Sequence, residues 1–269
     1  LQSICYLRRQ SNTMKIPIIM TAFGTTSKAT ATYSHLDTSL RNHFPDEEIL
    51  WSYSSRVITR RLQEQDRRTA HHPEDLLQQL AAQGVEKATV QSLHLFPGSE
   101  FHSLHNLTQN APLECSSGMP ILTSPEDYDE VGELLRPLIN ARPEQTILVV
   151  GHGTVHPSWT AYYSLEKVLR QKFNRPIHVG VIEKYPRSDH LIDEFADKGV
   201  TSVCIIPLFL VTGLHFRRDI MGDGEQSWKS RFKRRSIAVE AIDYGLGFYP
   251  GFDQLVIRHI REARQALTS

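Results

Sequence analysis

Three side chains that suit a divalent metal ion follow apolar, strand-like runs in the second half of the chain. They are His152, which lies between two glycines, Glu183 and His215. Two imidazoles and a carboxylate bind borderline ions such as Co²⁺, Ni²⁺, Fe²⁺ or Zn²⁺. A neutral imidazole is also a base near pH 7, because its unperturbed pKa is about 6.5. Each residue alone is more often a hydrogen-bonded or surface group, but the set of three favours a site that holds a metal and accepts protons.

The elements expected to position these residues alternate along the chain. The expected strands are nearly continuous apolar runs, typical of strands buried on both faces of a parallel sheet: 15–22, 89–95, 145–150, 177–182 and 203–211. The expected helices follow turn or cap residues: 73–83, 125–140, 159–173, 189–198 and 250–267. This alternation predicts a doubly wound α/β architecture. In such sheets ligands bind at the carboxyl ends of the strands, which is where the three residues fall.

An internal repeat divides the chain into two similar halves. The segment 18–25 resembles 147–154 at an offset of 129, and 84–101 aligns without a gap on 199–216 at an offset of 115. Between them, 48–56 matches 176–184 at an offset of 128 by strand pattern alone. We therefore expect two doubly wound parallel-sheet subdomains, residues 14–140 and 141–269, with a cleft between them. The second carries the metal site and ends in the helix 250–267.

The repeat also pairs the candidate residues with positions in the first half. Phe23 corresponds to His152 and Glu100 to His215, while Glu183 corresponds to a serine. If both halves face one cleft, the second half supplies the metal ligands. The first half then supplies an apolar wall that includes Phe23, and Glu100 takes protons or guides the ion from the opposite side. The alternative for Glu100 is a solvated charge after the preceding turn.

Composition excludes several other classes of protein. Lys+Arg and Asp+Glu number 30 each, so the chain has no basic excess for nucleic acid. No apolar run is long enough to span a membrane. No signal peptide is visible, which favours the cytoplasm, or the periplasm if such a peptide was removed before Leu1. The 3 cysteines form no CxxC pair and predict neither a cysteine zinc site nor a disulfide framework.

The ordered motifs resemble a known family. The chain is similar, from about residue 15 to 265, to the anaerobic sirohydrochlorin cobalt chelatases of the CbiK type, which are related to ferrochelatases. The resemblance rests on Phe23-Gly24-Thr25-Thr26, Gly151-His152-Gly153-Thr154, Glu183-Lys184-Tyr185-Pro186, the block from His215 to Lys229, and Gly245-Leu246-Gly247. A lysine beside Glu183 and the bulky, basic Phe216-Arg217-Arg218 depart from the pattern we expect of the family.

The resemblance implies an α/β metal chelatase, a lyase that inserts a divalent metal into sirohydrochlorin without a nucleotide. The pathway would be the synthesis of cobalamin or another modified tetrapyrrole such as a porphyrin. Co²⁺ would be the metal, with Fe²⁺, Ni²⁺ or Zn²⁺ as substitutes. His152, Glu183 and His215 would bind it, and the histidines would accept the pyrrole protons.

The resemblance also suggests further ligands and residues. Sirohydrochlorin is a polycarboxylate, and Arg pairs well with carboxylates. The basic candidates for its binding are Arg56, Lys184, Arg217, Arg218 and, secondarily, Arg187. Some family members bind an additional haem, so haem b is a further expectation, with His94 and His102 as candidate ligands.

Two alternatives stay open. Ferrochelation of sirohydrochlorin or a porphyrin needs the same residues, because ligand type does not decide between Co²⁺ and Fe²⁺. A non-catalytic haem or metal carrier needs the ligands but no bases. A surface metal site at His71-His72 is a minor expectation, and a homo-oligomer is compatible with the sequence.

Overall fold

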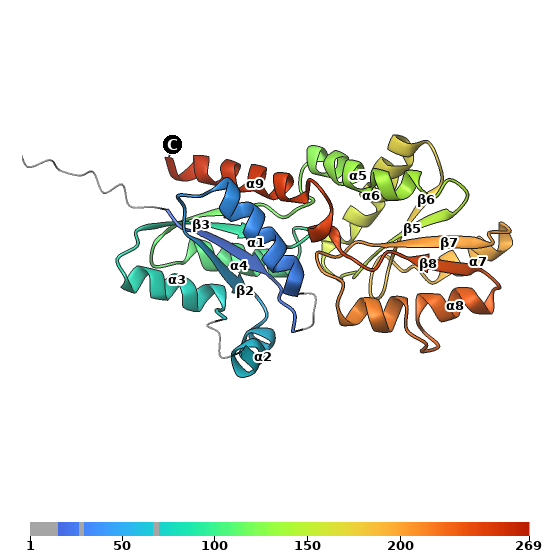
Figure 1. The fold of residues 1–269 in the computed structure, drawn as a ribbon, viewed down its shortest axis with the longest axis horizontal. Helices are drawn as coiled ribbons and strands as arrows, with labels where there is room; N and C mark the ends of the chain where they lie inside the picture. The colour runs from blue at the N-terminus through green and yellow to red at the C-terminus, as the bar shows by residue number, and fades with distance from the viewer. Residues whose placement is uncertain (1–15, 27–29, 67–69, 269) are drawn as a thin grey trace, which may run out of the picture.

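Two four-stranded parallel sheets lie side by side, one in each half of the chain (Figure 1). The computed structural model describes residues 16–26, 30–66 and 70–268. The predicted starts of the first half and its first strand, residues 14 and 15, lie outside the described residues. Within that part of the chain, no helix is long and apolar enough to cross a membrane.

The N-terminal sheet has the strand order β2-β1-β3-β4. Alternate residues of its first strand face opposite layers: Ile18 and Met20 pack toward one core, Ile19 toward the other. Its strands are β1 (Ile18–Ala22), β2 (Ile49–Tyr53), β3 (Lys87–Ser92) and β4 (Glu114–Gly118). Its helices are α1 (Ala31–His43), α2 (Arg56–Asp66), α3 (Pro73–Ala82) and α4 (Ser99–Gln109).

The C-terminal sheet has the order β6-β5-β7-β8, which is the same order repeated. Its strands are β5 (Thr146–Gly151), β6 (Ile177–Val181), β7 (Ser202–Pro207) and β8 (Ala238–Ala241). The elements around it are α5 (Pro125–Asn140), η2 (Pro157–Trp159), α6 (Thr160–Phe173), α7 (His190–Asp197), η3 (Phe216–Ile220), α8 (Trp228–Arg234) and η4 (Leu246–Phe248).

The strand register reproduces the repeat residue by residue. Ile18 of β1 lies opposite Ile49 and Thr89. In the other sheet, Ile147 of β5 lies opposite Ile177 and Cys204. These pairs are related by offsets of 129, 128 and 115, the same three that relate the sequences. The predicted α/β fold with an internal duplication is therefore confirmed.

The last helix, α9 (Phe252–Thr268), crosses back to the first half. It packs on β3, β4 and α1, although it follows the C-terminal sheet in sequence (Figure 1). The sequence placed this helix in the second half, whereas spatially it covers strands of the first. Its apolar face completes a core that includes residues of both sheets. The two halves are thus tied together by packing as well as by the chain.

The predicted strand 203–211 is too long at its carboxyl end. Strand β7 ends at Pro207, yet the apolar run continues because Leu208 and Leu210 are buried in the core. The carbonyl of Leu210 accepts a hydrogen bond from the N–H of Gly247 at 3.1 Å. Burial beneath a loop, and not strand pairing, explains these residues.

Candidate metal and proton-transfer site

His152 and Glu183 are brought together by a close approach of the two backbone segments that follow β5 and β6. The N–H of Glu183 donates to the carbonyl of His152 at 3.2 Å. Gly153 has a φ of +89°, and a Cβ there would lie 1.8 Å from the carbonyl oxygen of Glu183. Only glycine permits both the backbone angle and the contact. The glycine after His152 therefore sets the distance between two candidate ligands.

A buried tyrosine fixes the same turn. The hydroxyl of Tyr162 on α6 accepts a hydrogen bond from the N–H of Gly153 at 3.0 Å. The N-terminal half repeats the arrangement, since Tyr33 on α1 is hydrogen bonded to the backbone of Gly24, which has a φ of +100°. The tyrosines are 129 residues apart, in agreement with the repeat.

His215 is oriented by an aspartate on the next helical turn. It precedes the π-helix η3, and its Nδ1 lies 2.7 Å from Oδ2 of Asp219. Burial alone would raise the pKa of Asp219, but hydrogen bonds from Arg218 and His215 lower it, so the group is a carboxylate and accepts. The proton of His215 therefore sits on Nδ1, and its Nε2, which faces Nε2 of His152, carries the lone pair that a metal needs.

The two imidazoles face each other with a spacing that suits one ion. The Nε2 atoms of His152 and His215 are 3.3 Å apart, and the rings are nearly perpendicular at 80°. Two nitrogens bound at about 2.0–2.1 Å to a tetrahedral ion lie about 3.3 Å apart. Burial and the neighbouring His215 lower the pKa of His152, which favours the neutral form that binds metal.

Glu183 lies on the other side of the His152 ring. Its Oε1 is 3.5 Å from Nδ1 of His152 and 3.2 Å from Nζ of Lys184. The three ligand atoms therefore do not yet converge on one point. Glu183 is exposed, and its side chain would have to rotate to bring a carboxylate oxygen to the Nε2 atoms.

Most basic residues predicted to hold substrate carboxylates are engaged with carboxylates of the protein. Arg218 donates two hydrogen bonds to Asp219, at 2.7 and 3.0 Å. Lys184 pairs with Glu183, and Arg56 pairs with two acidic residues at the start of α3. Arg217 is exposed and has no ion pair within the described ranges 16–26, 30–66 and 70–268.

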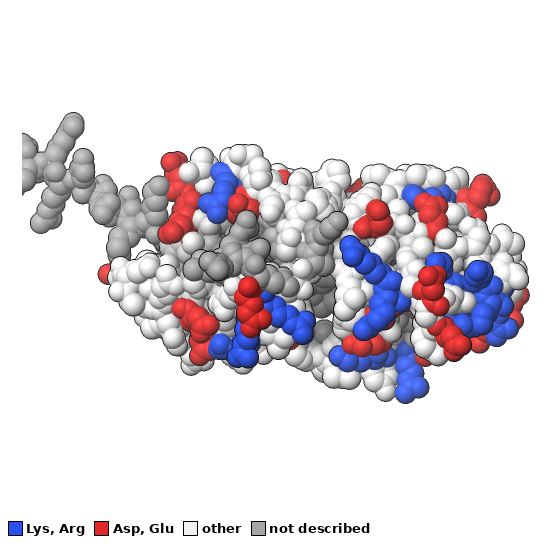
Figure 2. Space-filling view, turned by 60° about the horizontal axis from the view of Figure 1, so that its bottom comes forward, with Lys and Arg blue, Asp and Glu red and all other residues white. Residues whose placement is uncertain are grey.

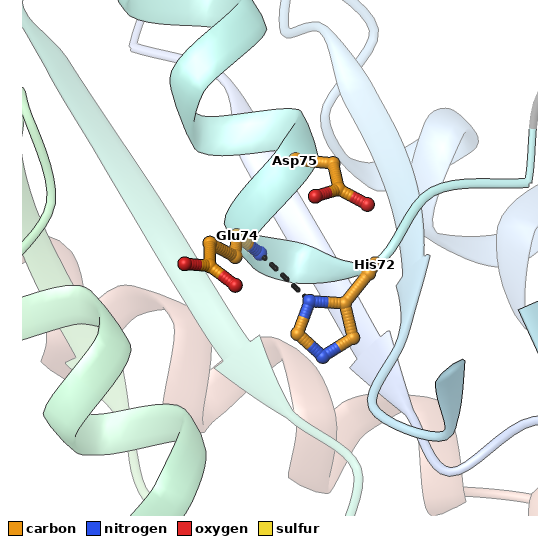
Figure 3. A group of neighbouring side chains, drawn as sticks. All are labelled: His72, Glu74 and Asp75. Atoms are coloured by element: carbon orange, nitrogen blue, oxygen red, sulfur yellow. Dashed lines mark hydrogen bonds between the residues drawn. The ribbon is translucent and has the colours of Figure 1, made fainter.

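The group formed by His72, Glu74 and Asp75 brings metal-type ligand atoms within 4.8 Å of one another (Figure 3). In Figure 3 the Nδ1 of His72 accepts a hydrogen bond from the N–H of Glu74, at 3.3 Å. His72 is thus the N-cap of α3. Arg56 pairs with both carboxylates. The group is explained as a capped helix start with an ion pair, so the minor expectation of a metal site here gains no support.

In the N-terminal half the predicted residues form a second polar group. Oε2 of Glu100 accepts a hydrogen bond from the Ser54 hydroxyl at 3.0 Å. Nε2 of His94 lies 3.2 Å from the same hydroxyl, and its Nδ1 lies 2.9 Å from Oγ of Ser92. Because both ring nitrogens of His94 are engaged, the residue does not fit an axial haem ligand in this arrangement, and no step is assigned to a haem.

The carboxyl edges of the two sheets meet around these groups. The ring of Phe96, after β3, lies 4.8 Å from that of Tyr162. His102 of α4 is exposed, and its ring lies 5.1 Å from that of His156, in the loop after β5. Glu100, in the first turn of α4, and His152, in the loop after β5, thus belong to segments that approach each other. The cleft predicted between the halves stays a prediction.

Large apolar side chains stand exposed beside the candidate ligands. Val155 is 71%, Leu214 65% and Tyr185 45% exposed, and each lies within three residues of His152, His215 or Glu183. Phe23, at the position equivalent to His152, is 51% exposed. Exposed apolar side chains thus adjoin each of the three candidate ligands in sequence, and a contiguous patch of such groups is typical of a surface for an apolar ligand.

Two residues with clear roles escaped the sequence-based prediction of the site. The contact between Asp219 and His215 could have been predicted from their spacing. His215 lies four residues before Asp219, and positions i and i+4 share a helix face. The repeat could have indicated a role for Tyr162, because Tyr33 occupies the equivalent position in the first half. Their side-chain hydrogen bonds could be seen only in three dimensions.

Comparison with known proteins gives concordant results. A family model described as cobalt chelatase (CbiK) matches residues 17–265. The chain is 33% identical to sirohydrochlorin cobaltochelatase of Salmonella typhimurium over 93% of this chain and 97% of that protein. It is 28% identical to sirohydrochlorin cobaltochelatase CbiKC of Nitratidesulfovibrio vulgaris, over 93% and 91%. The structure of SirB from Bacillus subtilis with Fe³⁺ shares the fold, with a TM-score of 0.66, 17% identity and coverage of 95% and 98%.

Proposed function

The chain belongs to the cobalt chelatase (CbiK) family, and from this premise we propose that it inserts Co²⁺ into sirohydrochlorin without consuming a nucleotide. The observation that carries the proposal is the pair of imidazole Nε2 atoms 3.3 Å apart, with Glu183 beside Nδ1 of His152 and exposed apolar side chains close in sequence to these residues. A metal-binding group that adjoins an apolar surface is what an enzyme needs to present an ion to the face of a macrocycle.

His152 and His215 bind the incoming ion through Nε2, and Glu183 turns to complete the set. Imidazole nitrogens and a carboxylate oxygen, all with free lone pairs, suit a divalent ion of intermediate softness. Asp219 keeps the proton of His215 on Nδ1, so that this imidazole can bind without changing tautomer. The ion is a substrate, and it leaves with the macrocycle.

The macrocycle lies against the exposed apolar residues at the carboxyl edges. Val155, Tyr185 and Leu214 contact it on the metal side, and Phe23 contacts it from the other half. Its carboxylates extend to the rim, where Arg217 has no competing ion pair among the described residues. Figure 2 shows Lys and Arg side chains on the C-terminal half beside its junction with the N-terminal half.

The reaction exchanges one M²⁺ for two N–H protons, with no change of oxidation state. As the pyrrole nitrogens bind the ion, the two protons must pass to bases within hydrogen-bond reach. An imidazole released from the ion accepts a proton on the metal side. Glu100, an exposed carboxylate on the facing edge, accepts one on the opposite side.

The same donor set binds Fe²⁺, Ni²⁺ and Zn²⁺, because ligand type alone does not separate these ions. We therefore propose that these ions substitute for Co²⁺. Cobalt is proposed as the principal metal because the relatives are named cobaltochelatases.

The test is an absorbance time course of sirohydrochlorin with Co²⁺, with and without the protein. An enzyme gives a rate that is proportional to protein concentration and exceeds the spontaneous rate. A protein that binds Co²⁺ stoichiometrically but leaves the spontaneous rate unchanged is the metal carrier of the alternative hypothesis. Repeating the assay with Fe²⁺ in place of Co²⁺ decides between cobalt chelation and ferrochelation.

A further inference from the structure

We propose that His94 is a positioning residue for Glu100 and acts through the hydroxyl group of Ser54. The inference deepens the proposed function, because it rests on Glu100 as the proton acceptor opposite the metal. It assigns to His94 a role that needs neither a metal nor a haem.

The hydrogens of this group have one consistent arrangement. Ser54 has a single hydroxyl proton, and it is donated to Oε2 of Glu100. The Ser54 oxygen must therefore accept from Nε2–H of His94, across 3.2 Å. Nδ1 of His94 then lacks a proton and accepts from the Ser92 hydroxyl, at 2.9 Å. The backbone N–H of His94 donates to that same Ser92 oxygen at 3.2 Å.

The imidazole in the middle of this chain is neutral at physiological pH. Burial lowers the pKa of His94 to about 4. The hydrogen-bond partners of its ring, Ser54 and Ser92, are uncharged. A neutral imidazole has one proton, and the two serines leave it a single tautomer. The chain of hydrogen bonds therefore runs in one direction and ends on the Glu100 carboxylate.

The repeat provides an internal control for what the fold itself requires. The positions equivalent to Ser54, Ser92 and His94 are Ile182, Pro207 and Phe209. The C-terminal half thus builds the same strand ends with apolar side chains. Enclosing an imidazole and two hydroxyls in place of apolar groups costs desolvation that their hydrogen bonds only offset. The fold therefore does not require the hydrogen-bonded side chains Ser92, His94 and Ser54. The effect that is left to explain their presence is the positioning of Glu100.

Glu100 occupies a place from which it can reach a ligand held by the other half. It lies between Gly98 and His102 on α4, and both of these approach the loop after His152. A Cβ on Gly98 would lie 3.4 Å from Oγ of Ser158, and His102 contacts His156. The equivalent of Glu100 is His215, a proposed metal ligand. Ser54 holds Oε2 of Glu100, which leaves Oε1 to face the substrate.

The experiment measures kcat and KM for sirohydrochlorin with Co²⁺ for single and double variants. We expect Glu100→Gln to lower kcat about 100-fold, within the usual range for a general base, and Ser54→Ala and His94→Phe to lower it about tenfold. KM, and the affinity of the free enzyme for Co²⁺ measured by calorimetry, should stay within about twofold of wild type in all three variants. Neither proton acceptance by Glu100 nor its positioning by His94 contributes to ground-state binding. His94→Phe introduces the ring found at the equivalent position 209, and Ser54→Ala is a smaller change should that ring disturb folding.

Two comparisons separate positioning from a structural effect. In the Glu100→Gln background, Ser54→Ala and His94→Phe should cause no further loss of kcat, since the group they position is gone. His94→Gln, which can offer an amide N–H near the position of Nε2, should restore most of the kcat lost in His94→Phe. Ser103→Ala, an exposed serine on α4, is the matched control and should equal wild type.

Full kcat in both Ser54→Ala and His94→Phe, or losses that add to that of Glu100→Gln, would overturn the positioning role. Full activity of Glu100→Gln together with an inactive His152→Ala would overturn this inference and leave the proposed metal site standing. A wild-type protein without turnover would overturn the proposed function as well.

Discussion

The two halves of the molecule share a scaffold and differ in the residues at its carboxyl edge. Both sheets have the same strand order and register, and both hold a glycine turn with a buried tyrosine, Tyr33 in one half and Tyr162 in the other. Where the C-terminal half has His152 and His215, the N-terminal half has Phe23 and Glu100.

In the proposed function, the two copies of a duplicated fold divide one reaction between them. In the proposed reaction, one edge supplies the nitrogen ligands of the ion, and the facing edge supplies an apolar side chain and a carboxylate. A macrocycle between them would meet the metal on one face and a base on the other. Neither edge alone has the residues for both tasks.

The largest expected effect comes from removing an imidazole on the C-terminal side. We expect His152→Ala and His215→Ala each to lower the rate of Co²⁺ insertion at least about 100-fold, because each loses a ligand and a base. Initial rates from absorbance measure the effect. His190→Ala, an exposed histidine on α7 of the same half, is the control. Wild-type rates in both active-site variants would remove the distinction between the two edges.

Glu183 should affect metal loading more than turnover. We expect Glu183→Gln to weaken Co²⁺ binding at least about tenfold, since even outer residues of metal sites change affinity about 10–100-fold. At saturating Co²⁺ most of kcat should return. Calorimetric titration with Co²⁺ gives the affinity, and Glu126→Gln, exposed on α5, should bind as wild type does. Unchanged affinity would exclude Glu183 from the ligand set.

The paired tyrosines allow the same substitution to be made in both halves. Tyr33→Phe and Tyr162→Phe each leave a glycine N–H without its partner, at the half-buried Gly24 and the buried Gly153, so each should lower the free energy of unfolding by about 1–2 kcal/mol. Only Tyr162→Phe should also weaken Co²⁺ binding, because its glycine adjoins His152. Denaturant unfolding and calorimetry test both statements. Equal effects of the two variants on Co²⁺ binding would contradict the assignment of the metal to one half.

The smallest expected effect is on the pH dependence of stability, and it comes from His259 on α9, the helix that packs across both halves. Both ring nitrogens of the buried His259 face acceptors, the carbonyl of Met119 at 3.0 Å and the carboxylate of Asp127 at 2.8 Å. Burial would lower the pKa of His259, but these hydrogen bonds outweigh it and raise the pKa, despite the nearby Arg258. Glu130 is a second carboxylate beside Arg258.

A raised pKa in the folded state means that the protonated imidazole stabilises the fold. Its contribution is complete below the unfolded pKa of about 6.5 and is lost as pH rises through the folded pKa. Denaturant unfolding at a series of pH values from below about 6.5 upward should therefore show a free energy of unfolding that falls as pH rises. His259→Gln should make this dependence on pH weaker. A wild-type curve that rises with pH would contradict the charged state of His259.

Much of this architecture could be predicted from the sequence, because strands that are buried on both faces of a sheet appear as nearly continuous apolar runs. The helix at 125–140 was predicted with its observed bounds, since a Ser124 cap, Pro125 and an amphipathic pattern coincide there. The repeat offsets paired Phe23 with His152 and Glu100 with His215, the two proposed imidazole ligands. Helices α1, α2, α4 and α8 and the edge strands β4 and β8 were not predicted, because their polar faces and short lengths leave weak periodicity.

The site was predictable in its residue types and less so in its bonding. Strand ends and glycines indicated His152, Glu183 and His215. The structure places the two imidazole Nε2 atoms 3.3 Å apart, whereas the Glu183 carboxylate lies beside Nδ1 of His152, so the set of three ligands stays a prediction. The engagement of Arg218 with Asp219 and of His94 with two serines depends on rotamers, and sequence spacing does not specify rotamers. The docking of α9 on the N-terminal sheet depends on chain crossover, which an amphipathic pattern does not encode.

The most direct test of the central claim is anomalous diffraction at the cobalt edge from crystals soaked in Co²⁺. The account predicts one strong peak bound by Nε2 of His152, Nε2 of His215 and a carboxylate oxygen of Glu183. A peak elsewhere, for example at His72, with no density between His152 and His215, would contradict it.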